Sequence, residues 1–130
     1  MQAAAASSAP NHECQAPADL DGLVVHGRVR ARGLIGLVSV PGELSFQGGM
    51  LVWATGDSED VGPYAVSATD CLLAFTAEHV IENGEHVRWS GVSDGRTVSD
   101  VTAIWTRVEG DFVHDLLLPE QVTLDFTPDA

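Results

Sequence analysis

Residues 72–105 decide the fold, and they read LLAFTAEHVIENGEHVRWSGVSDGRTVSDVTAIW. Short runs rich in β-branched and aromatic residues are separated by Asn83-Gly84 and Asp94-Gly95, two dipeptides typical of two-residue hairpin turns. Glu109-Gly110 follows as a third such signal. Three consecutive tight hairpins predict an antiparallel meander over this part of the chain.

The same alternation of strand-like runs and turn residues extends from Leu20 towards the C-terminus. The candidate strands are Leu23–Arg32, Leu34–Val40, Glu43–Phe46, Met50–Ala54, Tyr64–Ala68, Leu72–Ile81, His86–Val92, Thr97–Val108, Phe112–Leu118 and Val122–Phe126. So many short antiparallel strands must close or stack to hide their edges. We therefore predict an all-β, antiparallel meander β-barrel of about eight strands over residues 20–130, after a flexible leader at residues 1–19. A two-sheet sandwich is the structural alternative.

Cross-strand partners share a face of a sheet, so two-residue turns would sort the meander into two sides. Those registers pair Ile81 with His86, Arg88 with Val101, and Trp105 with His114. The apolar residues then expected to point inward are Leu73, Phe75, Val101, Trp105, Phe112, Leu116, Val122, Leu124 and Phe126. The polar residues expected on the same face are His79, His86, Arg88, Arg107 and His114. This register places Trp89 and Trp105 on opposite faces of the sheet. A bulge or a three-residue turn at residues 94–96 would bring both to one face.

Two short runs, Leu73-Ala74-Phe75-Thr76 and Trp89-Ser90-Gly91, are followed by Trp105. This part of the chain resembles the second half of an avidin-type barrel. Avidins belong with the lipocalins to the calycin superfamily of β-barrels. The resemblance implies an eight-stranded barrel that encloses a ligand.

The predicted ligand-binding residues are Arg88, His86, His114, Trp105, Phe75 and Phe112. The arginine would grip a planar anionic group, the histidines would donate hydrogen bonds, and the three aromatic rings would form an apolar wall. We therefore expect non-catalytic binding of a small apolar molecule, which can be anionic, inside the barrel. No cofactor is expected, and the chain has no phosphate loop or His-Glu-x-x-His motif.

Two other functions remain open at this point. A secreted protein-interaction or enzyme-inhibitor module would use the leader or the rim loops to contact a protein partner. A metal-binding protein would use His79, His86 and His114, since neutral imidazoles suit zinc or copper. A hollow interior would favour the small ligand, whereas a fully packed interior would favour the interaction module.

Charge and cysteine content restrict the partners and the compartment. The formal net charge of −13 disfavours nucleic acid and anionic lipid surfaces. No apolar run approaches the roughly 20 residues of a membrane helix, so we expect no membrane span. Cys14 and Cys71 fit a disulfide between the leader and the sheet, which favours a secreted or periplasmic protein over one with two free thiols.

Overall fold

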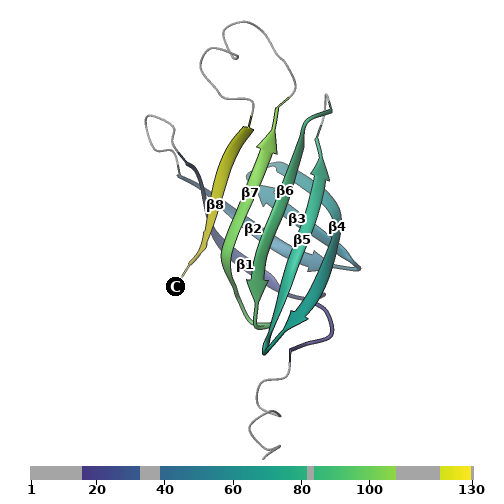
Figure 1. The fold of residues 1–130 in the computed structure, drawn as a ribbon. Helices are drawn as coiled ribbons and strands as arrows, with labels where there is room; N and C mark the ends of the chain where they lie inside the picture. Colours follow the sequence, from purple (N-terminus) through teal and green to yellow (C-terminus); the bar gives the residue numbers. More distant parts are fainter. Residues whose placement is uncertain (1–15, 33–38, 82–83, 108–120, 130) are drawn as a thin grey trace, which may run out of the picture.

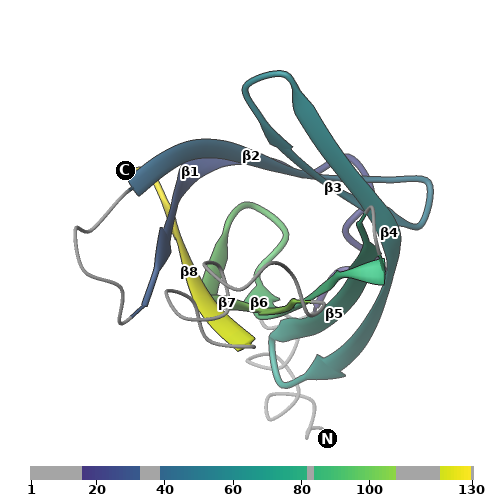
Figure 2. The same cartoon turned by 90° about the horizontal axis from the view of Figure 1, so that it is seen from above.

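The computed structural model describes residues 16–32, 39–81, 84–107 and 121–129. Eight antiparallel strands form a closed barrel in meander order, and β8 pairs with β1 to complete the ring (Figures 1 and 2). The strands are β1 (Val24–Ala31), β2 (Ser39–Gln47), β3 (Met50–Thr55), β4 (Ser58–Thr69), β5 (Leu72–Val80), β6 (His86–Ser93), β7 (Val98–Thr106) and β8 (Gln121–Pro128). The predicted all-β meander barrel is confirmed, and the sandwich alternative is wrong. No helix within the described ranges is long and apolar enough to cross a membrane.

Alternation of buried and more exposed residues explains why these segments become barrel strands. In β5 every second side chain is buried, from Leu73 through Phe75 and Ala77 to His79. The expected interior residues Leu73, Phe75, Val101, Val122, Leu124 and Phe126 are all buried, and Trp105 is half-buried on the inner face. Phe112 and Leu116, also expected inside, lie outside the described residues.

The predicted register between β5 and β6 is wrong by one residue. Val80, not Ile81, pairs with His86, and His79 pairs with Val87. The backbone N–H of Ile81 donates to the carbonyl oxygen of Glu85 at 2.7 Å, so the connection is longer than the assumed two-residue turn. Because side chains alternate with period two, a one-residue shift moves the whole of β6 to the other face.

The register between β6 and β7 also differs from the prediction. Arg88 pairs with Ile104 rather than Val101, while Val87 pairs with Trp105. A β-bulge between Ser90 and Val92 shifts the register by one residue. The bulge brings Trp89 and Trp105 to the inner face together, which was the alternative left open by the sequence, although it lies at Gly91 rather than at residues 94–96.

Gly91 is required at the bulge because the backbone there approaches the core. A Cβ atom on Gly91 would lie 2.8 Å from the ring of Phe75 and 2.9 Å from a methyl group of Val101. Packing therefore explains the run Trp89-Ser90-Gly91 in this barrel. Trp89 fills the interior, and the missing side chain of Gly91 leaves room for Phe75 and Val101 on the neighbouring strands.

One end of the barrel, which we call the packed end, is filled by aromatic and aliphatic side chains. The Phe46 ring lies edge-on to Tyr64 and Phe75, at centroid distances of 5.0 and 5.2 Å. Leu20 is buried against this core, and its backbone N–H donates to the Tyr64 hydroxyl at 3.0 Å. Tyr64 in turn donates to Asp21 at 2.8 Å. The segment before β1 is thereby fastened across this end of the barrel.

Candidate functional site

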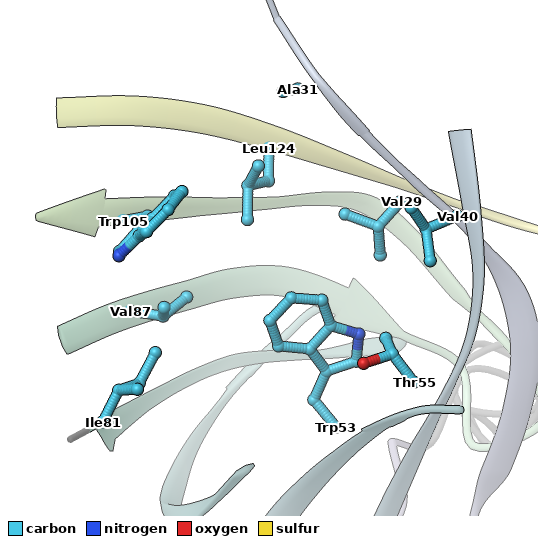
Figure 3. A pocket seen from close by; sticks show the side chains of 9 residues that line it. All are labelled: Val29, Ala31, Val40, Trp53, Thr55, Ile81, Val87, Trp105 and Leu124. Carbon is cyan, nitrogen blue, oxygen red and sulfur yellow. The ribbon is translucent and has the colours of Figure 1, made fainter. Parts of the chain in front are cut away.

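The opposite end of the barrel, which we call the pocket end, contains a cavity of about 370 Å³. It lies where β1, β3, β5 and β7 end. The lining residues are Val29, Ala31, Val40, Trp53, Thr55, Ile81, Val87, Trp105 and Leu124, whose side chains surround a common space (Figure 3). None of these described lining residues carries a charge. The volume and the apolar lining are typical of a site for a small organic molecule.

The strands position the lining residues by simple alternation. Val29 and Ala31 are two residues apart on β1, and Trp53 and Thr55 are two residues apart on β3, so each pair projects to the inner face. Small side chains such as Ala31 stand at this end, whereas phenylalanines occupy the packed end. The short side chains do not fill the space between Trp53 and Trp105, which leaves the pocket end hollow.

Below the pocket, Trp89 and His79 form a buried hydrogen-bonded pair that supports the Trp53 ring. The Trp53 ring, which lines the pocket, lies edge-on to Trp89 at a centroid distance of 5.2 Å. Trp89 Nε1 donates to His79 Nδ1 at 3.2 Å, and His79 Nε2 then donates to the Leu51 carbonyl oxygen at 2.9 Å. Both imidazole nitrogens are therefore used within the protein, and burial lowers the pKa of His79 and keeps the ring neutral.

Gly62 on β4 allows this arrangement to form. A Cβ atom at Gly62 would collide with the Glu78 carbonyl oxygen and would lie 2.9 Å from the His79 ring. The close approach of β4 and β5 places His79 where it reaches both Trp89 and Leu51. His79 is consequently a structural residue of the pocket floor and is not free to bind a metal ion.

The rim of the pocket carries an acidic group. Trp105 Nε1 donates to Glu85 Oε1 at 3.0 Å, and Glu85 is half-buried just before β6. Further along the chain, Arg107 is buried with 8% of its surface exposed and already interacts with a neighbouring group. The hydrogen bond from Trp105 to Glu85 fixes the orientation of the Trp105 ring, which is one aromatic wall of the pocket.

The predicted site residues separate into three groups. Trp105 lines the pocket as expected, whereas Phe75 is buried in the packed end. The expectation that Arg88 and His86 face the interior is wrong, because the shifted register puts them on the outer surface. There Arg88, with 71% of its side chain exposed, lies 3.5 Å from Glu78, and His86 lies 3.3 Å from the same carboxylate. His114 and Phe112 lie outside the described residues.

Trp53 and Val87 also line the pocket, and neither is among the ligand-binding residues predicted from the sequence. A signal for Val87 is present within β6 itself, where apolar Val87 and Trp89 alternate with polar His86, Arg88 and Ser90. This alternation favours the observed face over the one deduced from turn length. A similar signal exists for Trp53, which lies two residues after the buried Leu51 on the same strand, so both side chains point to the inner face.

The metal hypothesis receives no support from the described residues. His79 is inside the barrel and His86 is outside, so the two do not share a site. No group of three or more His, Cys, Asp or Glu side chains suited to a metal ion occurs among the residues described. His114 lies outside them.

Comparisons with protein-family models, with curated proteins and with solved structures give no match. The resemblance to avidins and lipocalins therefore stays an expectation.

Proposed function

We propose that this protein binds a small apolar molecule, without catalysis, in the pocket end of its barrel. The observation that carries the proposal is the cavity of about 370 Å³ walled by Trp53, Trp105 and aliphatic side chains, in a barrel whose other end is tightly packed. Burial of apolar surface contributes about 25 cal/mol per Å², so such a cavity offers a substantial driving force for an apolar occupant. The hollow interior also favours a ligand carrier over the protein-interaction module.

The proposal differs from the sequence-based expectation in its account of charge. Arg88 was expected to anchor an anionic group, but its place on the outer surface removes that role. The walls of the described pocket offer aromatic faces, aliphatic groups and the Thr55 hydroxyl. The proposed ligand therefore needs no arginine-bound anionic group.

The pocket is tested by filling it. Ala31→Phe should place a ring in the cavity and reduce binding of decan-1-ol at least about tenfold, by steric exclusion, with little loss of stability because the ring enters existing space. Ala65→Phe on the exposed outer face of β4 is the matched control and should bind as the wild type does. Titration followed by tryptophan fluorescence and calorimetry measures the affinities. If Ala31→Phe binds decan-1-ol as well as the control does, the pocket is not the site.

We also propose that the protein works in an oxidising compartment, secreted or periplasmic, with a Cys14–Cys71 disulfide. Cys71 stands in the turn between β4 and β5 at the packed end, which the segment containing Leu20 also crosses. Cys14 lies outside the described residues. Peptide mapping without reductant should recover a cross-linked pair of peptides containing the two cysteines. Complete alkylation of both thiols in unreduced protein purified from its native compartment would contradict this proposal.

A further inference from the structure

The carboxylate of Glu85 stands at the rim of the pocket with a distinctive set of neighbours. It accepts a hydrogen bond from the indole of Trp105, a lining residue, at 3.0 Å. No cationic side chain of the described residues forms an ion pair with it. A half-buried carboxylate favours a positively charged partner, because an opposite charge compensates for lost solvation.

The six basic residues of the chain are all arginines, and none of them lines the pocket. Arg32 pairs with Asp125, Arg88 pairs with Glu78, and Arg28 bonds to Ser39. Arg30 is on the outer face of β1, Arg96 is in the turn at the packed end, and Arg107 is buried and engaged. An anionic ligand would therefore enter a pocket in which no described lining residue is cationic, in a chain of net charge −13.

The aromatic walls favour the opposite charge. The indole rings of Trp53 and Trp105 both line the cavity, and Figure 3 shows them on different sides of the common space. A tryptophan face attracts a cation more strongly than the other aromatic side chains do. The rest of the lining is aliphatic and suits a hydrocarbon body.

We propose that the occupant of this pocket is a cationic amphiphile, namely an apolar body that carries a protonated amine, with the amine at the rim formed by Glu85 and Trp105. This inference rests on the proposed function and specifies its ligand class. The cavity of about 370 Å³ has room for roughly twelve non-hydrogen atoms, at about 30 Å³ each as in a liquid. A single medium-length alkyl chain or a two-ring aromatic body with one amine fits this volume.

The test compares decylamine, decan-1-ol and decanoate, which share a hydrocarbon chain and differ in the charge of the head group. Binding to the full chain is measured by calorimetry at low ionic strength and neutral pH. Decylamine should bind about tenfold more tightly than decan-1-ol, because the Glu85 carboxylate and the two indole rings attract its ammonium group. Decanoate should bind most weakly, because the same groups disfavour its negative charge. Added salt should reduce the preference for the amine because it screens the rim charge.

Two variants separate a local effect of Glu85 from the effect of total charge. Glu85→Gln keeps an oxygen that accepts from Trp105 but removes the charge, so it should bring decylamine to within about twofold of decan-1-ol. Asp70→Asn removes the same charge from the turn at the packed end, where asparagine tolerates the positive φ of 53°, and should leave the preference unchanged.

The outcomes distinguish this inference from the proposed function. Equal binding of the three compounds or tighter binding of decanoate would overturn the cationic ligand class and leave an apolar pocket. An amine preference that survives Glu85→Gln would overturn the placement of the amine at the rim formed by Glu85 and Trp105. Failure of all three compounds to bind would overturn the proposed function as well. A preference lost in Glu85→Gln but retained in Asp70→Asn supports the inference.

Discussion

The packed end and the pocket end of this barrel are built from the same strands but are filled differently. β3 places Leu51 in the packed end and Trp53 in the pocket wall, while β5 runs from Leu73 and Phe75 in the packed end to His79 under the pocket. At the packed end, aromatic rings meet edge to face and Leu20 covers them. Because these buried contacts are concentrated at the packed end, we expect that end to supply most of the stability, so that the other end can leave space for a ligand.

The largest expected effect comes from emptying the packed end. Phe46 is fully buried and its ring contacts both Tyr64 and Phe75. Phe46→Ala should lower the free energy of unfolding by about 3–5 kcal/mol, because it removes buried surface and leaves a cavity. Urea denaturation at neutral pH measures the change. A loss of less than about 1 kcal/mol would mean that this end is not the main source of stability.

The second prediction concerns the floor between the two ends. His79→Phe should destabilise the fold by about 2–4 kcal/mol, because Trp89 Nε1 and the Leu51 carbonyl oxygen both lose their partner. His86→Phe, on the outer surface of the next strand, is the control for loss of a histidine and should have a much smaller effect. Equal losses in the two variants would contradict a structural role for the buried imidazole.

The stability that the hydrogen-bonded pair of His79 and Trp89 contributes should decrease at acidic pH. Burial lowers the pKa of His79 in the folded protein, whereas the unfolded chain protonates this residue at its ordinary pKa of about 6.5. Its stabilisation is therefore complete above that pH and is lost as pH falls towards the lowered value, by at most about 1.4 kcal/mol per pH unit. The stability difference between wild type and His79→Phe should shrink below pH 6.5. A difference that stays constant down to acidic pH would be contrary to expectation.

Much of the architecture was predictable, because β1, β5 and β8 show a regular alternation of apolar residues that fixes their inner face. The candidate site was less predictable because its register was deduced from turn length. Asn83-Gly84 suggested a two-residue turn, but Ile81 bonds to Glu85, and the resulting one-residue shift turned Arg88 and His86 outward. The bulge at Gly91 depends on contacts with Phe75 and Val101, which lie far apart in the sequence. Local turn signals do not contain that tertiary information.

The smallest expected effect is at the pocket end. Ile81 is half-buried and already faces the cavity. Ile81→Ala should therefore cost only about 1 kcal/mol, below the range of about 2–5 kcal/mol for a fully packed isoleucine, because few contacts are lost on the cavity side. The measurement is the same urea denaturation. A loss as large as that of Phe46→Ala would indicate that the two ends are packed alike.

The central claim, an apolar binding pocket at the pocket end of the barrel, is tested most directly by the indole N–H signals of the three tryptophans. ¹H–¹⁵N spectra are recorded while decan-1-ol is added to the wild-type protein. The pocket residues Trp53 and Trp105 should shift saturably, while Trp89, held by His79 beneath the pocket, should shift least. Absence of saturable shifts at Trp53 and Trp105, or a larger shift at Trp89, would contradict the account.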